Sequence, residues 1–134
     1  MVDASALTVA VLGTSPGSRE LRQRLASEVC HAPHLVDAEL GNVLRRRVLR
    51  GEIGADPALE LLLGGSILID RHYEMTRSLA TAAWALRENL SFYDAICVAL
   101  AQALAVPLLT CDARLSRAPE LPCAVELVGA ARPR

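Results

Sequence analysis

The stretch from Asn89 to Cys111, NLSFYDAICVALAQALAVPLLTC, constrains the fold most strongly because Asp94 is its only charged residue. The part from Ala95 to Leu104 reads as a helix without a polar face, and such a helix is buried. A short apolar strand, Val106–Leu109, follows it. Asp94 therefore heads a buried helix, where its carboxylate costs several kcal/mol unless a helix cap or a bound cation compensates it.

Length and composition limit the possible functions. The chain has 134 residues, so we expect a single domain over residues 1–134, and its 52% hydrophobic content argues against disorder. The net charge of -1 gives no general positive field, so any basic site must be local. All 14 basic residues are Arg. Schiff-base catalysis and a P-loop are therefore excluded, and phosphate handling by Arg or a metal ion is favoured.

The cellular setting follows from what the sequence lacks. Its four cysteines show no CxxC spacing, which indicates reduced thiols in a cytosolic protein. The N-terminal MVDASAL has no basic segment of a signal peptide. The long apolar stretch is too short to span a bilayer and contains Gln102 and Pro107. We expect a soluble cytoplasmic protein that does not cross a membrane.

Predicted strands alternate with predicted helices along the chain, which indicates an α/β fold. The strands are expected at Val2–Asp3, Glu28–Ala32, Ser66–Asp70, Val106–Leu109 and Ala124–Val128. The helices are expected at Ala6–Leu12, Ser18–Ser27, His34–Arg50, Ala55–Leu63 and Tyr73–Glu88, from Ser91 onward, and as a short turn after Asp112. This order predicts three α/β/α layers with a central parallel sheet. We expect Gly64 and Gly65 to end the fourth helix and Arg132–Arg134 to be loose.

Three aspartates are predicted to meet at one edge of this sheet. Asp3 follows the first strand and Asp112 follows Val106–Leu109. Asp94 heads the buried helix that leads into the same strand. Parallel α/β sheets bind ligands outside the carboxyl ends of their strands. The sequence therefore predicts that Asp3, Asp94 and Asp112 converge there.

Glu39 is a fourth candidate acid. It lies at the edge of the apolar stripe of its helix. Carboxylates gathered in one pocket repel, and without a cation one of them would stay protonated. Such a set suits Mg²⁺ or Mn²⁺, which prefer carboxylate oxygens and keep some water.

Each acid also has a structural alternative, and the residues alone leave it open. Asp3 and Asp112 could cap the helices that follow them. The segment from Ser91 to Asp94 fits a capping box, and Glu39 could be a solvated helix residue. Arg45–Arg47 and Arg50 could likewise form a solvated helix face. Their alternative is a phosphate or partner contact, because Arg46 and Arg50 lie on the Glu39 side of the helix.

Other site chemistries have less support. His31 and His34 near Cys30 lack a second pair of zinc ligands, and no GxSxG, GxGxxG or HExxH motif occurs. Aromatic residues make up 3% of the chain, which argues against a base-stacking platform. Trp84 and Met75 are interpreted as ordinary packing residues.

Four segments occur in a recognisable order over nearly the whole chain: VDASAL, HAPHLVDAELGNVLRR, LSFYDAICVALAQAL and PLLTCDARL. With them the sequence resembles the PIN domain, specifically the VapC ribonuclease toxins of bacterial type II toxin–antitoxin pairs. The resemblance implies that the catalytic, metal-binding acids are Asp3, Glu39, Asp94 and Asp112. It also implies supporting roles for Ser5 and Thr110, which match small hydroxyl positions, and for Asn42, which matches a polar position near the site.

The resemblance further implies a Mg²⁺- or Mn²⁺-dependent endoribonuclease that cuts RNA with metal-activated water. The implied partners are a cognate VapB-like antitoxin, the RNA substrate and a second copy in a homodimer, with Arg46 or Arg50 contacting RNA or antitoxin. The alternative is a PIN-like binding module with little or no nuclease activity, which the very short first strand favours. A phosphatase-like hydrolase is disfavoured because the chain has no Lys and no second Asp two residues after Asp3.

Overall fold

A computed structural model of the protein describes residues 1–129, so the tail expected to be loose at 132–134 lies outside the described residues. The predicted alternation of strands and helices is confirmed. The helices are α1 Ala4–Leu12, α2 Pro16–Ser27, α3 Leu35–Leu49, α4 Ala55–Ile67, α5 Arg77–Ala85, α6 Phe92–Leu104 and α7 Ala113–Ser116. The strands are β1 His31–Pro33, β2 Arg71–Tyr73, β3 Leu108–Thr110 and β4 Val125–Leu127.

The strands form a parallel sheet with the N-terminal segment at its centre. β1 pairs with β2 and β3 pairs with β4, both in parallel. Val2 connects the two pairs: its N–H donates to the His31 carbonyl at 2.8 Å, and it forms a parallel bridge with Leu109. The spatial order is therefore β2, β1, Val2, β3, β4. The predicted central parallel sheet is confirmed, with its first strand reduced to a single bridging residue.

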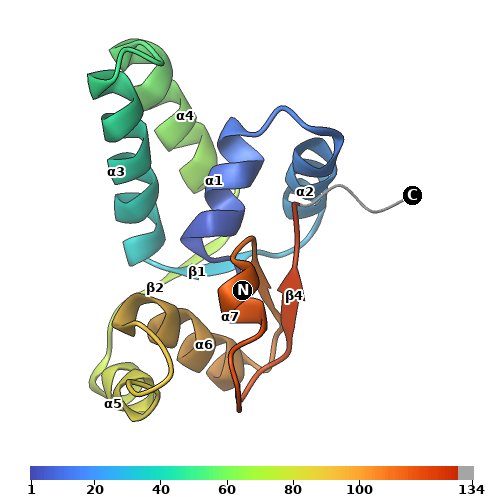
Figure 1. The fold of residues 1–134 in the computed structure, drawn as a ribbon, viewed down its shortest axis with the longest axis vertical. Coiled ribbons are helices and arrows are strands. Elements are labelled where there is room, and N and C mark those ends of the chain that lie inside the picture. The colour runs from blue at the N-terminus through green and yellow to red at the C-terminus, as the bar shows by residue number, and fades with distance from the viewer. Residues whose placement is uncertain (130–134) are drawn as a thin grey trace.

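Helices cover both faces of this sheet. In Figure 1, α1 to α4 lie on one side of the strands, and α5 and α6 lie on the other. Each side has its own buried cluster, one built mainly from α1 to α4 and one centred on α6. Every residue of α6 from Ala95 to Ala101 is buried, as expected for a helix without a polar face. The three-layer α/β/α fold is thus confirmed.

The prediction that Gly64 and Gly65 end a helix is wrong, because α4 continues through both to Ile67. Gly65 is buried against α1 and α3. A Cβ there would lie 2.7 Å from Leu40 Cδ2 and 2.9 Å from Val11 Cγ2. Gly65 therefore permits a close approach between helices, and the longer helix displaces the next strand from the predicted Ser66–Asp70 to β2.

Three other predicted boundaries shift for local reasons. Pro33 belongs to β1, because His34 N–H donates to the Tyr73 carbonyl at 2.9 Å and the pairing with β2 needs no donor from Pro33. Thr76 caps α5 through its side chain, so that helix begins at Arg77 and not at Tyr73. Ala105 adopts a left-handed backbone with φ of 53° after α6, which delays β3 to Leu108.

Two further expectations were examined in the described residues. All four cysteines are free thiols, in agreement with the sequence. Within residues 1–129, none of the helices combines the length and the apolar content needed to span a bilayer.

Candidate active site

The four acids singled out in the sequence line one cavity of about 100 Å³. Its walls are Asp3, Ala4, Ser5, Glu39, Tyr93, Asp94, Cys97 and Asp112. The fold therefore brings together side chains that are up to 109 positions apart in the sequence (3 to 112).

The backbone explains why they meet. Asp3 is the N-cap of α1 and directly follows the central bridging residue of the sheet. Asp112 follows β3 and is the N-cap of α7. Because Val2 and β3 are parallel neighbours, both aspartates emerge at the same edge. Asp94, in the first turn of α6, and Glu39, on α3, complete the cavity from the two opposite helical layers.

The Ser5 hydroxyl connects the two aspartate-bearing segments. It donates to Asp3 Oδ1 at 2.6 Å and accepts from Cys111 N–H at 2.8 Å. It also lies 3.1 Å from the Thr110 hydroxyl, which accepts from Asp112 N–H at 3.0 Å. These bonds form a continuous chain from the Asp112 backbone to the Asp3 carboxylate. Ser5 and Thr110 thus fix the positions of Asp3 and Asp112 relative to each other.

The capping alternatives proved correct for two of the four acids. Asp3 Oδ1 accepts from Ala6 N–H at 2.8 Å, and Asp112 Oδ1 accepts from Arg114 N–H at 2.8 Å. Capping and lining the cavity are therefore compatible for these residues. Because only one oxygen of each carboxylate receives its helix N–H bond, the second oxygen is not used by the cap.

Asp94 and Glu39 behave differently. Ser91 caps α6 by accepting from Asp94 N–H at 3.2 Å, but the Asp94 carboxylate makes no reciprocal bond of a capping box. Among residues 1–129, neither the Asp94 nor the Glu39 carboxylate has a hydrogen bond or an ion pair. No structural role within the described chain accounts for these two acids.

The surroundings disfavour full ionisation of the cavity. Burial raises the pKa of Asp3, and the charge of Asp94 adds to this, against hydrogen bonds from Ser5, Thr110 and Ala6 N–H. Burial also raises the pKa of Glu39, followed by the charges of Asp3 and Asp94. The pKa of Asp112 is lowered, chiefly by the Arg114 N–H. A cation in the cavity would offset both the burial and the repulsion that raise the pKa values of Asp3 and Glu39.

The donor set fits a hydrated divalent cation. All four donors are hard carboxylates, and two of them have no hydrogen-bond or ion-pair partner within residues 1–129. The four carboxylate groups line different parts of the cavity wall and do not converge on one point. In the described part of the chain, no three His, Cys, Asp or Glu side chains already form a metal-binding group. Ligation partly through water, as Mg²⁺ prefers, suits such spacing.

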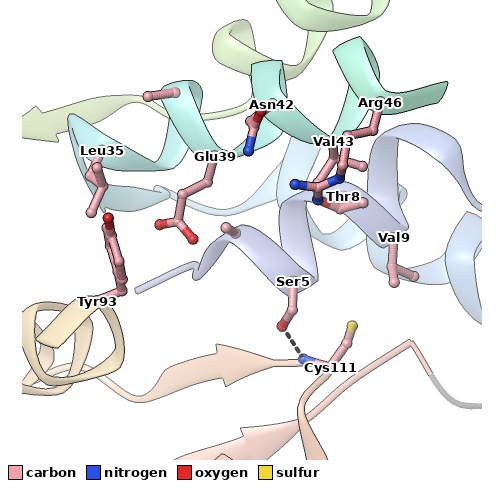
Figure 2. A pocket seen from close by; sticks show the side chains of 12 residues that line it. Ser5, Thr8, Val9, Leu35, Glu39, Asn42, Val43, Arg46, Tyr93 and Cys111 are labelled. Atoms are coloured by element: carbon pink, nitrogen blue, oxygen red, sulfur yellow. Dashed lines mark hydrogen bonds between the residues drawn. The ribbon is translucent and has the colours of Figure 1, made fainter. Parts of the chain in front are cut away.

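A larger cavity of about 690 Å³ adjoins the acids between α1 and α3, and shares Ser5, Glu39 and Tyr93 with the smaller one. Figure 2 shows Glu39, Asn42 and Arg46 extending along α3 toward α1, with Tyr93 beside Glu39. The structure therefore brings Asn42 and Arg46 to the site. It does not bring Arg50, which lies outside both cavities with its guanidinium 3.8 Å from the Glu52 carboxylate.

Apart from Ala4, two residues that line the acidic cavity were missed in the sequence. Tyr93 precedes Asp94, and Cys97 follows it by almost one helical turn. The spacing of Cys97 from Asp94 could have revealed it, since residues three apart share a helix face. Burial, followed by the charge of Asp3, raises the pKa of the Cys97 thiol, so it stays neutral beside the carboxylates.

Comparisons with known proteins give a consistent result. A family model described as the PIN domain matches residues 1–121. The chain is 47% identical to Ribonuclease VapC1 of Mycobacterium tuberculosis over 128 residues, which is 96% of each chain. It is 39% identical to VapC ribonuclease Mb0985 of Mycobacterium bovis, over 96% of this chain and 97% of the relative. It is 33% identical to Ribonuclease VapC12 of Mycobacterium tuberculosis, over 96% and 98%.

Proposed function

The chain belongs to the PIN domain family, and we propose that it is a metal-dependent endoribonuclease, the VapC-type toxin of a type II toxin–antitoxin pair. The VapC ribonucleases with which it aligns match it almost from end to end. The observation that carries the proposal is the single cavity lined by four carboxylates, two of them without any partner among the described residues. We take residues 1–134 as one PIN-like domain.

PIN-domain ribonucleases depend on a divalent metal ion in general, and we propose Mg²⁺ or Mn²⁺ here. Bound in the cavity, the ion would lower the pKa of a water molecule and neutralise phosphate charge. Asp3, Glu39, Asp94 and Asp112 would hold it, directly or through water. Ser5 and Thr110 keep Asp3 and Asp112 aligned through the hydrogen bonds described above.

The residues that line the two cavities also indicate which chemical groups end the RNA products. Neither cavity is lined by a histidine, so no imidazole pair is available to deprotonate an attacking ribose 2′-hydroxyl and to protonate the departing 5′-oxygen. We therefore expect hydrolysis that leaves 5′-phosphate and 3′-hydroxyl ends. Asn42 and Arg46 line the larger cavity and would contact the RNA backbone or acidic groups of the antitoxin.

Substitution of the acids tests the proposal. Asp94→Asn and Asp3→Asn should each reduce EDTA-sensitive RNA cleavage on the order of 10²–10³-fold, since metal ions contribute several kcal/mol to such reactions. Asparagine also caps helices well, so the fold should survive Asp3→Asn. The matched control is Glu60→Gln, on the exposed face of α4 and outside both cavities. If both aspartate variants cleaved RNA at the rate of the wild type, the assignment of the site would be overturned.

The remaining partners follow from the toxin assignment. We propose a VapB-like antitoxin that inhibits the protein, an RNA substrate, a homodimer and a cytoplasmic location. Co-expression with the product of a small adjacent reading frame should relieve growth arrest. Size measurement of the purified toxin tests the dimer.

Two observations favour a second candidate, a PIN-like binding module with little nuclease activity. The carboxylates do not form a ready metal-binding group among the described residues, and the first strand is a single bridge. Growth arrest on expression separates the two functions. If arrest occurs and is lost in Asp94→Asn, the protein acts as a nuclease; arrest that persists in the variant favours the binding module.

A further inference from the structure

Most of the aromatic side chains lie on the surface beside the active site. The chain has one Trp, two Tyr and one Phe. Three of these four are substantially exposed: Trp84 at 61%, Tyr93 at 58% and Phe92 at 38%. Aromatic rings dominate core packing wherever a fold can bury them. The interpretation of Trp84 as an ordinary packing residue is therefore wrong, as is that of Met75, which is 53% exposed. The 3% aromatic content argues against an extended base-stacking platform, but a small one can be built from these three exposed rings.

Two of the three rings are in contact, and a cation lies over one of them. The Trp84 and Phe92 ring centres are 6.3 Å apart in an edge-to-face arrangement. The Arg87 guanidinium lies over the Trp84 ring, 5.6 Å from its centre. Tyr93 follows Phe92 in the first turn of α6. We call Trp84, Arg87, Phe92 and Tyr93 the aromatic ridge.

One ridge residue, Tyr93, reaches the catalytic cavity. Tyr93 lines both the acidic cavity and the larger one beside it, and Asp94 is the next residue. Figure 2 shows the Tyr93 ring standing next to the Glu39 carboxylate, at the end of the larger cavity away from Arg46. Because consecutive helical residues point about 100° apart, Tyr93 can face the cavity while Phe92 faces Trp84. A strand leaving the acidic cavity past Tyr93 would pass the start of α6, where Phe92 pairs with Trp84.

We propose that the aromatic ridge stacks the unpaired bases next to the scissile phosphate, so that the substrate must be single-stranded at the cleavage point. The proposal rests on the nuclease function, which places that phosphate at the acids. Four carboxylates repel a polyanion, and the net charge of -1 offers no compensating field. Stacking on exposed rings, with Arg adding a cation–π contact, supplies affinity that does not depend on overall charge. Bases inside a duplex already stack on each other and cannot use the ridge.

A single-stranded RNA accounts for these features better than a second copy of the chain would. A protein covering the ridge would cover Tyr93 and with it the rim of the catalytic cavity. The Arg87 side chain is about half exposed and lies 3.8 Å from the exposed Glu88 carboxylate, and its guanidinium suits a phosphate backbone. A protein interface on the ridge is nevertheless a distinct outcome of the test below.

Trp84 is the only tryptophan, so its fluorescence reports on the ridge directly. The full-length protein is titrated with an unstructured oligoribonucleotide in EDTA, which prevents cleavage, and separately with the same strand annealed to its complement. The single strand should quench Trp84 and the duplex should not. Trp84→Leu should weaken binding of the labelled single strand about 5- to 150-fold, the range expected for one lost stacking contact. Trp84→Phe, which keeps a ring, should retain most of the affinity.

The control is Ile67→Ala, an apolar residue 81% exposed on α4, which should bind RNA like the wild type. Unquenched fluorescence on binding, or equal affinity of Trp84→Leu and wild type, would overturn the proposal. So would a Trp84→Leu variant that loses a dimer in sedimentation while its RNA affinity stays constant. Binding with quenching but without cleavage when Mg²⁺ is added would leave the ridge in place and refute the nuclease function instead.

Discussion

At the scale of single residues, Ser5 decides how the acidic cavity is assembled. Its hydroxyl donates to the Asp3 carboxylate and accepts from Cys111 N–H, directly after β3. It also lies 3.1 Å from the Thr110 hydroxyl, which accepts from Asp112 N–H. Ser5, together with Thr110, therefore links the two halves of the site.

Ser5→Ala should lower the free energy of unfolding by about 1–3 kcal/mol, because the partly buried Cys111 N–H loses its acceptor. It should also weaken metal binding, since Asp3 loses a hydrogen bond that lowers its pKa. Urea denaturation measures the first effect and metal titration the second. Ser27→Ala, whose exposed hydroxyl bonds only to the Arg24 carbonyl, should change stability by less than about 0.5 kcal/mol. Equal losses in the two variants would contradict this role for Ser5.

Resemblance to a family marked Ser5 and Thr110 as supporting positions, but the residues themselves did not reveal how they act. Their hydroxyls meet across 105 sequence positions, and one-dimensional patterns carry no information about such a contact. The acids were easier to predict, because strand ends in a parallel sheet share an edge. Arg50 illustrates the limit. It shares the Glu39 side of the helix but lies too far along it to reach either cavity.

At the scale of elements, α4 shows how a distant contact changes local preference. A Gly-Gly pair after an apolar run is typical of a helix end. Here Gly65 faces Leu40 and Val11, which belong to other helices, and the lack of a side chain permits close packing. The sequence could not distinguish the two cases, because Val11 and Leu40 lie far from Gly65 in the chain. By contrast, α6 was predictable, since its apolar pattern requires burial whatever its neighbours are.

The two glycines of α4 provide a matched pair. Gly65→Ala should destabilise the fold by about 1–3 kcal/mol, because its Cβ would lie within 3 Å of two buried or partly buried side chains. Gly64→Ala meets nothing within 4 Å and should stabilise the fold by about 0.5–1 kcal/mol through helix propensity. Thermal or urea unfolding of both variants measures the contrast. Similar values for the two would mean that Gly65 does not mark a close contact.

At the scale of the whole molecule, the fold gathers negative charge that it does not neutralise internally. The layers on both faces of the sheet contribute acids to one cavity, and two of these acids have raised pKa values. A raised carboxyl pKa means that the fold favours the protonated form. Stability from such a group is therefore complete below its unfolded pKa and falls as pH rises through the folded pKa. Without metal, the ionised carboxylates of the cavity lower the free energy of unfolding at neutral pH.

Glu39→Gln should consequently make the metal-free protein more stable than the wild type at pH 7. The difference should disappear as pH falls below the ordinary range of a glutamate, where the wild-type side chain is protonated in both states. Comparing variant with wild type at each pH removes the contribution of Asp112. Its lowered pKa acts in the opposite direction, giving stability that is lost as pH falls. A destabilised Glu39→Gln protein at pH 7 would contradict the repulsion inferred here.

Metal binding should raise the free energy of unfolding of the whole domain. At a Mg²⁺ or Mn²⁺ concentration about 100 times the dissociation constant, the wild type should gain about 2.7 kcal/mol at neutral pH, because only the folded chain assembles the site. The gain should shrink as pH falls, since protonated carboxylates do not bind metal. Thermal unfolding with and without metal measures it. Asp94→Asn should lose most of the gain and Glu60→Gln should keep it. A wild-type protein whose unfolding temperature does not respond to either ion would show that the four carboxylates gather for a reason other than holding a cation.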